Sequence, residues 1–361
     1  MKRLFVVSVL LLGLAACAAP TMTGPGASID RGLIDAERQK QYELAVEENL
    51  KQYERLNRVG FPILRANADW CGRDGRTRPS IGALIAGTAH MKEPTKAALK
   101  RVLEMNNDGA VITGVPSGTP AAEAGLRRGD QIVSLNGQTV SAQTNSAELL
   151  DDMKKAADDS FAHKKPLTLA INRDGKSITK SVSPVLACDF YVAIDNKDVI
   201  NAFADGKGIV FTKGMMRFAN EDDELAVVMG HELGHNLNHH IDSKKTNAAG
   251  GLLLDILAAA GGVNTQGMFS GLAASAYSQD FEREADYVGL YLTARGGYDI
   301  EDAPNFWRRM AIESPASIKD SHTSSHPATP ERFLALESTV KEIESKLSSK
   351  RKLEPDKNLR F

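Results

Sequence analysis

Apolar side chains recur at helical spacing near the start of the chain, within a stretch that is polar overall. Residues 34–59 therefore predict a long helix with one narrow packing face. Its apolar positions are Leu44, Leu50, Tyr53 and Leu56. Residues 61–68 either continue this helix or follow a break at Pro62, because proline removes a backbone donor from a helix interior.

The same spacing predicts helices in the second half of the chain. One covers Leu225 to Ile241 and has acidic residues in its first turn, where the helix dipole favours them. Another begins at Asp280 and ends at Gly296-Gly297. Two more are expected at 298–310 and 330–348. Residues 189–218, before these helices, are expected to be mostly strands.

Short runs of β-prone residues, separated by turn signals, mark a different module in the middle of the chain. Asn136-Gly137 and Asp174-Gly175 are typical of hairpin turns. The expected strands are 109–115, 131–135, 167–172 and 177–182, and the expected helices are 91–105, 119–124 and 146–157. The sequence therefore predicts an α+β chain in which a β-rich module interrupts helical segments.

The N-terminus has the features of an export signal. Met1-Lys2-Arg3 is followed by an apolar run from Leu4 to Ala16, which is too short to span a bilayer. Leu14-Ala15-Ala16-Cys17 resembles a bacterial lipobox, which implies a lipidated Cys17. Residue 18 is alanine, which favours the outer membrane, facing the periplasm. Simple secretion with an unmodified Cys17 is the alternative.

Composition narrows the functional classes. A length of 361 residues allows two or three domains, and 42% hydrophobic with 25% charged residues is ordinary for a globular protein. The formal net charge is −2, and no basic patch interleaved with aromatic residues is present. These features argue against nucleic acid as a partner.

The motif His231-Glu232-Leu233-Gly234-His235 carries the strongest chemical signal. Positions i and i+4 of a helix lie on one face, so both histidines can turn a ring nitrogen toward one metal ion. Glu232 lies beside them as a candidate general base. A solvated helix face with two histidines is the simpler alternative.

A catalytic zinc site needs a third protein ligand and an open position. Glu282 and Asp286 lie four residues apart on the second metal-proximal helix and share a face. Glu282 can ligate the metal, and Asp286 can accept the free ring N–H of a ligand histidine. Alternatively, both are ordinary acidic residues at the start of a helix.

These motifs, in this order, resemble the M48 family of zinc metallopeptidases. The resemblance covers residues 188–336. The matching segments are H-E-L-G-H-x-x-x-H, E-x-E-A-D, Ser325-His326-Pro327 with Arg332 six residues after the histidine, and Asn201-Ala202-Phe203 upstream. The resemblance implies a zincin-like fold and one Zn²⁺ per subunit.

Residue roles follow from the same resemblance. It implies that zinc is bound by His231, His235 and Glu282, with Glu232 as the general base and Asp286 as a support. It implies that His326 is catalytic, as a reversible fourth ligand or an oxyanion helper, accompanied by Arg332. The edge strand for substrate is expected at Asn201, Ala202 and Phe203. His239 matches a frequent family histidine of no clear role.

The middle module resembles a PDZ domain. The resemblance rests on S-G-T-P-A-A-E-A-G-L-R-R-G-D-Q-I-V-S-L-N-G at residues 117–137. PDZ domains add a peptide to a sheet edge, but no G-L-G-F-like segment precedes Gly109. A spacer or lid is therefore the alternative to a peptide reader. Cys71 and Cys188 bracket the module, and a disulfide between them is expected in an oxidising compartment, with two buried thiols as the alternative.

The expected domain order is a signal peptide (1–16), a tether (17–30), an N-terminal helical part of the peptidase (31–75), a PDZ-like insertion (76–187), the zinc metallopeptidase domain (188–348) and a polar tail (349–361).

The leading hypothesis is a membrane-anchored zinc endopeptidase that acts on misfolded or misassembled cell-envelope proteins. A lipid-anchored periplasmic binding or chaperone-like protein with a latent metal site is the alternative. A metal-dependent hydrolase of a non-peptide envelope substrate is a third, weaker hypothesis.

Overall fold

A computed structural model describes residues 29–243, 245, 246, 249, 256, 278–313, 326 and 329–356. The expected signal peptide and Cys17 lie outside the described residues. The helices are α1 (Arg31–Ala66), α2 (Ala68–Arg73), α3 (Thr95–Val102), α4 (Pro120–Glu123), α5 (Ser146–Ala162), α6 (Lys213–Phe218), α7 (Asp222–Leu237), α10 (Ser278–Arg295), α11 (Ala303–Glu313) and α12 (Pro330–Ser348).

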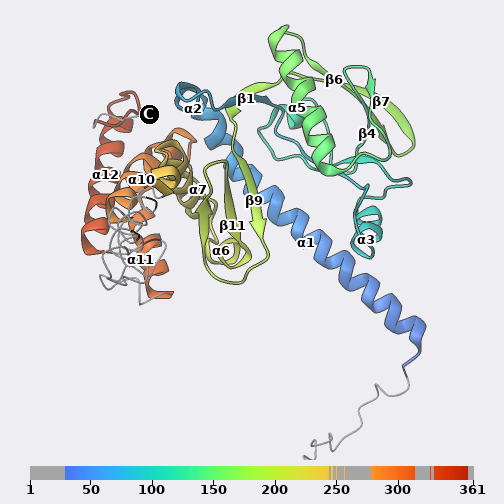
Figure 1. The fold of residues 1–361 in the computed structure, drawn as a ribbon, viewed down its shortest axis with the longest axis horizontal. Helices are drawn as coiled ribbons and strands as arrows, with labels where there is room; N and C mark the ends of the chain where they lie inside the picture. Colours follow the sequence, from blue (N-terminus) through green and yellow to red (C-terminus); the bar gives the residue numbers. More distant parts are fainter. Residues whose placement is uncertain are drawn as a thin grey trace, which may run out of the picture.

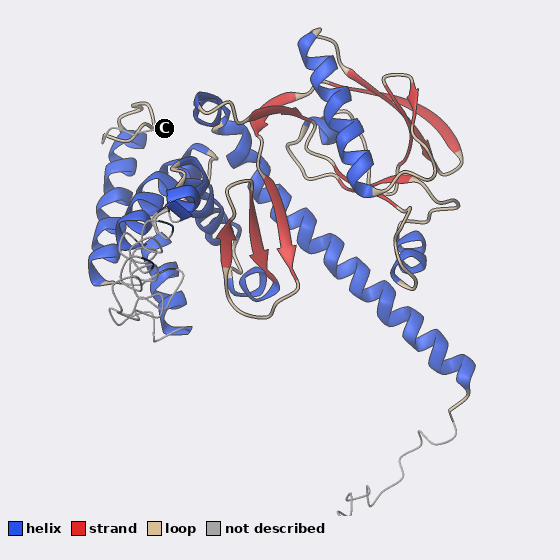
Figure 2. Cartoon of the chain, viewed as in Figure 1, coloured by secondary structure: helices blue, strands red, loops and turns tan. Residues whose placement is uncertain are grey.

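The strands form three sheets among the described residues, and the fold is α+β as expected (Figure 2). They are β1 (Thr77–Ser80), β2 (Leu84–Gly87), β3 (Ala110–Gly114), β4 (Gln131–Leu135), β5 (Gln138–Thr139), β6 (Leu167–Arg173), β7 (Lys176–Val182), β8 (Val185–Cys188), β9 (Tyr191–Asp195), β10 (Ala202–Ala204) and β11 (Gly208–Thr212). No described helix is both long and apolar enough to cross a membrane.

Helix α1 is the longest element and extends away from the body of the molecule (Figure 1). Its first turn is capped by Asp30, whose side chain accepts from the Gly32 N–H. It continues through Pro62, which settles the choice that the sequence left open. Proline 62 leaves the Arg58 carbonyl without its helical donor, and the Tyr298 hydroxyl donates to that carbonyl at 3.3 Å. Tertiary packing thus keeps the helix intact.

The middle module is built on a sheet with strand order β2-β3-β4-β6-β7, and β5 pairs with β4. Helix α5 packs on it, and the two contribute to one apolar core that includes Ile112, Leu149 and Leu169. Helix α3 is shorter than the expected 91–105. It follows Pro94 and stops before Glu104, whose φ of 53° lies in the left-handed region and cannot continue a helix.

The two ends of the module meet. Strands β1 and β8 pair antiparallel, with Thr77 opposite Cys188. Cys71 and Cys188 form a disulfide with a Cα–Cα distance of 5.4 Å. A second contact comes from α3 and the residues just after it, where Leu99 and Met105 pack with Val46 of α1. The module therefore rests on α1 as well as on its two connecting strands.

The remaining elements form the second large core. Strands β10, β11 and β9 make a small sheet beside α7, and α10, α11 and α12 pack on the other side (Figure 1). Helix α12 has the expected bounds. The segment after it was expected to be a polar tail, but its described part is held in place. The Lys346 ammonium, which is 3% exposed, donates to the Glu354 carbonyl at 2.6 Å and pairs with Asp356 at 2.7 Å.

Candidate metal centre

Helix α7 presents the two motif histidines to the interior. Residues 225–237 of this helix are buried throughout, so His231 and His235 are each no more than 2% exposed. Their Nε2 atoms lie 3.1 Å apart, as the i, i+4 spacing predicts. The neighbouring Glu232 is also 2% exposed. A solvated helix face, the simpler alternative from the sequence, is therefore wrong.

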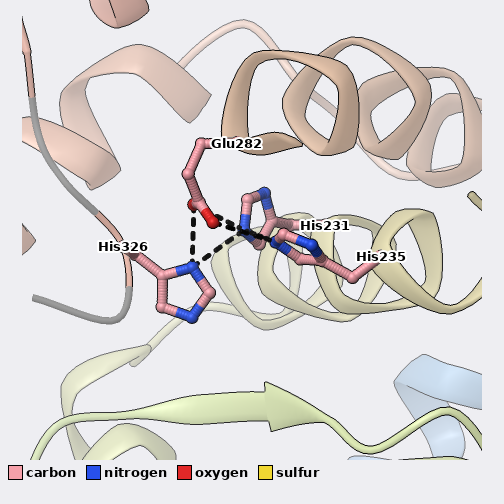
Figure 3. A group of neighbouring side chains, drawn as sticks. All are labelled: His231, His235, Glu282 and His326. Atoms are coloured by element: carbon pink, nitrogen blue, oxygen red, sulfur yellow. Dashed lines mark hydrogen bonds and ion pairs between the residues drawn. The ribbon is translucent and has the colours of Figure 1, made fainter. Parts of the chain in front are cut away.

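Helix α10 crosses α7 at very short range and carries Glu282, whose carboxylate lies beside the two histidines. A Cβ added to Gly230 would lie 2.4 Å from the Gly289 carbonyl oxygen, closer than any real contact, so the crossing requires glycine. This approach places the Glu282 carboxylate over the histidines, with Oε2 3.4 Å from His231 Nε2 and Oε1 3.2 Å from His235 Nε2 (Figure 3).

His326 completes the group from the segment that precedes α12. Its Nδ1 lies 2.8 Å from Glu282 Oε2 and 3.3 Å from His231 Nε2 (Figure 3). Its Nε2 lies 3.6 Å from Glu232 Oε1. One ligand atom from each of His231, His235, Glu282 and His326 falls within 4.8 Å of every other. The structure thus brings together residues that are up to 95 positions apart.

The group has the dimensions of a zinc site. Zinc–ligand distances of about 2.0–2.1 Å put neighbouring ligand atoms of a tetrahedron about 3.3 Å apart. Four of the separations given above, 3.1, 3.4, 3.2 and 3.3 Å, agree with this value, whereas the fifth, between His326 Nδ1 and Glu282 Oε2, is shorter at 2.8 Å. Two imidazoles and a carboxylate are also the donor types of catalytic zinc. Glu232 Oε2 is buried and has no hydrogen-bond partner among the described residues, which leaves it available to a further group at the site.

Asp286 lies beside the first histidine. Its Oδ1 is 2.9 Å from His231 Nδ1, which places the carboxylate next to the ring nitrogen for which the sequence analysis proposed it. Arg332 was expected to accompany His326. Its buried guanidinium donates to both carboxylate oxygens of Asp286, at 2.6 and 2.9 Å. It also lies 4.8 Å from the ring centroid of Trp307, which in turn packs on His231.

The buried side chains of the site shift one another's pKa values. Burial acts to lower the pKa of His231, but bonding to Asp286 and Glu282 outweighs it and raises the pKa to about 9. At His235 burial dominates, and the pKa falls to about 4. Burial acts to raise the pKa of the Glu282 and Asp286 carboxyls, but neighbouring groups outweigh it. The facing imidazoles hold the pKa of Glu282 below its usual range, and Arg332 does the same for the pKa of Asp286. Both carboxylates are therefore ionised at neutral pH.

Two neighbours of the site were missed or misplaced in the sequence analysis. His239, singled out there, is 44% exposed at its side chain and pairs with Asp74. The next residue, His240, is the buried one, and its Nδ1 lies 2.9 Å from His235 Nδ1. Trp307, which packs on His231, was not singled out in the sequence as part of the site. The spacing of His240 from the motif was available in the sequence, but the turn that buries it was not.

The expected substrate strand is β10, at the edge of its sheet. Ala202 and Ala204 are buried, whereas Phe203 is 36% exposed. Asn201 precedes the strand, and its carbonyl accepts from the Thr212 N–H at 3.0 Å. Strand β10 pairs with β11 on one side and packs against α7, the helix of the motif.

Comparison with known proteins agrees with this geometry. Residues 179–340 match Peptidase family M48, and residues 101–183 match the PDZ domain. The chain contains an M48 peptidase domain and a PDZ domain. Peptidases of family M48 are zinc-dependent, which agrees with the donor set.

Several curated proteins are similar to the chain. It is 29% identical to mitochondrial metalloendopeptidase OMA1 of Arabidopsis thaliana over 192 residues, which are 51% of the chain and 38% of that protein. It is 27% identical to the beta-barrel assembly-enhancing protease of Escherichia coli K12 over 190 residues, 47% of the chain and 38% of that protein. The same-named protein of Yersinia pestis is 28% identical over 163 residues, 41% of the chain and 33% of that protein. The chain thus matches 33–38% of the length of these relatives.

Proposed function

We propose that the chain is a zinc-dependent endopeptidase that hydrolyses peptide bonds of misfolded or misassembled cell-envelope proteins. The observation that carries this proposal is the buried group of His231, His235 and Glu282, with the side chain of Glu232 beside it. Two named relatives, a metalloendopeptidase and a beta-barrel assembly-enhancing protease, support the reaction class and the envelope setting.

His231, His235 and Glu282 would hold the zinc ion. When bound, zinc supplies a Lewis acid that polarises the scissile carbonyl and lowers the pKa of water. Glu232 takes up the proton of the attacking water and then passes it to the leaving amine. The buried oxygen of Glu232 that lacks a hydrogen-bond partner among the described residues suits this task. This sequence of events uses no serine or cysteine nucleophile, so reagents that modify those residues should not inhibit.

His326 is the fourth residue of the group, and its Nδ1 lies 3.3 Å from His231 Nε2. A histidine held there competes with water, whereas one displaced slightly can donate to a tetrahedral oxyanion. We propose that His326 acts catalytically in the second position and restrains the enzyme in the first.

Substrate is proposed to bind in extended form along β10, because its outer edge is not paired with another described strand and the strand packs on α7. Backbone pairing there would be independent of sequence, which suits unfolded chains. Anchoring to the outer membrane through a lipidated Cys17, with the domain facing the periplasm, remains a proposal from the sequence.

A lipid-anchored binding or chaperone-like protein is the second candidate. The position of His326 favours it, since a fourth protein ligand closes the corner that a catalytic site keeps open.

Cleavage of unfolded β-casein by the protein starting after Cys17 tests the proposal. Wild type with zinc should cleave, and both a chelator and Glu232→Gln should abolish cleavage. Glu344→Gln, at an exposed position of α12, is the matched control and should cleave normally. His326→Ala should raise the rate if His326 restrains the site, and lower it if its oxyanion role dominates. Stoichiometric zinc without cleavage by any variant would favour the binding protein.

A further inference from the structure

His240 is a buried histidine that the proposed reaction does not use. Helix α7 ends at Leu237, and His239 takes a left-handed φ of 53°, which turns the chain back toward the helix. His240 therefore points inward, is 1% exposed, and lies with its Nδ1 2.9 Å from Nδ1 of His235. This is the ring nitrogen of His235 that faces away from the other ligand atoms, since Nε2 is the one beside His231 and Glu282.

Helix α10 holds His240 from two sides. The ring stacks on Phe281, with centroids 4.5 Å apart and an interplanar angle of 22°. Its Nε2 lies 3.2 Å from Glu284 Oε2. Phe281 and Glu284 flank Glu282 in the sequence, so the segment that supplies the carboxylate ligand also fixes His240.

The directions of the hydrogen bonds from His235 through His240 to Glu284 follow from which of their atoms can donate. An ionised carboxylate only accepts, so His240 Nε2 donates to Glu284. A neutral imidazole carries one N–H, so His240 Nδ1 accepts, and the donor across the 2.9 Å contact is His235 Nδ1. His235 then has its lone pair on Nε2, the atom that faces His231 and Glu282.

We propose that His240 is a positioning residue for the metal: with Glu284 behind it, it fixes the tautomer and ring orientation of His235. This inference rests on the proposed zinc site. The other ligand histidine is fixed differently, by the Asp286 carboxylate at 2.9 Å from His231 Nδ1. His235 is thus oriented by the imidazole of His240, and His231 by the carboxylate of Asp286.

Zinc affinity, measured by competition with a chromophoric chelator, tests the proposal without relying on catalysis. His240→Leu keeps bulk but removes the acceptor, and it should weaken zinc binding by about 10–100-fold. His240→Asn places an amide oxygen near the position of Nδ1 and should bind much closer to wild type. His239→Asn changes the exposed neighbour at the same turn and should bind as wild type.

A purely structural role predicts a different pattern. In that case the leucine and asparagine variants would lose equal affinity, in step with their melting temperatures, and the proposal would be wrong. Wild-type affinity in His240→Leu would also overturn it. If wild type binds zinc but does not cleave casein, the proposed function fails while the affinity comparison still stands.

A measurement on the zinc-loaded wild type covers the case in which the leucine variant does not fold. The ¹⁵N shifts of the His240 ring report which nitrogen is protonated. We expect a neutral ring with its single proton on Nε2, bonded to Glu284. A proton on Nδ1 instead would contradict the assigned directions of the two hydrogen bonds of His240.

Discussion

Gly230→Ala is the substitution that most directly tests how the two metal-binding helices are held. The added Cβ would lie 2.1 Å from Thr293 Oγ1 and 2.4 Å from the Gly289 carbonyl oxygen. An ordinary contact needs about 3.4 Å, so α7 and α10 must separate by roughly 1 Å at this point. Thr293 cannot simply turn away, because its hydroxyl donates to the Gly289 carbonyl at 2.8 Å within the same crossing.

Two opposing contributions set the magnitude. Replacing a helical glycine by alanine stabilises a helix by about 1 kcal/mol. Overpacking a close contact costs about 1–3 kcal/mol, and a disturbed buried hydrogen bond adds about 1 kcal/mol. We expect a net loss of about 1–3 kcal/mol in the free energy of unfolding. A shift of about 1 Å between the histidines and Glu282 should also lower peptidase activity by about 100-fold.

Gly72→Ala is the matched control. Gly72 is also helical, but its added Cβ would meet only the Thr77 methyl at 3.6 Å, an ordinary contact. Chemical denaturation gives the stability of each variant, and chelator competition gives its zinc affinity. The control should be neutral or slightly stabilised and should bind zinc as wild type. If Gly230→Ala matches it in both assays, the crossing is not limited by backbone contact and the reasoning fails.

Three further predictions concern the disulfide, acid stability and the metal. Cys71→Ala/Cys188→Ala should lower the unfolding free energy by up to about 5 kcal/mol, since the bond closes a loop with a sequence separation of 117; equal denaturation midpoints with and without reductant would contradict this. Burial acts to raise the pKa of Glu342, but the hydroxyls of Tyr291 and Tyr287 hold it low, so its contribution is present above about pH 4.3 and lost as the pH falls through the folded value. Glu342→Gln should therefore destabilise at pH 7, and its difference from wild type should shrink as the pH is lowered below about 4.3. Removing the metal should lower the melting temperature, and zinc at 100 times its dissociation constant should restore about 2.7 kcal/mol, as scanning calorimetry would measure.

Local signals in the sequence were sufficient to predict most of the helices and strands. Helix α12 begins at Pro330, a favoured first-turn residue, and its bounds match the prediction. Helix α7 lacks only the last turn that was expected, because His239 adopts a left-handed conformation. The continuation of α1 past Pro62 was not decidable locally, because the donor that replaces the missing N–H comes from Tyr298.

The site was predictable where spacing along one helix determines geometry. His231 and His235 share a face by periodicity alone, whereas Glu282 reaches them only through the glycine crossing. His240 was missed because its burial depends on the conformation of a single turn residue. The family resemblance placed Arg332 with His326, and the structure adds a buried partner that spacing along the sequence could not reveal, the Asp286 carboxylate.

The peptidase core is assembled from both sides of the inserted module. Helix α1, which precedes the module, shares one apolar core with α7 and α10 through Leu56 and Ile63. Arg55 donates to the carbonyls of residues 216 and 219–221 and pairs with Asp222, so α1 also fixes the start of the motif helix. The module contacts this same helix near Val46, about two and a half turns before Arg55. The disulfide and the β1–β8 pair hold the two ends of the module together, so its insertion does not separate the segments that build the zinc site. Helix α1 contacts both the module and the peptidase core.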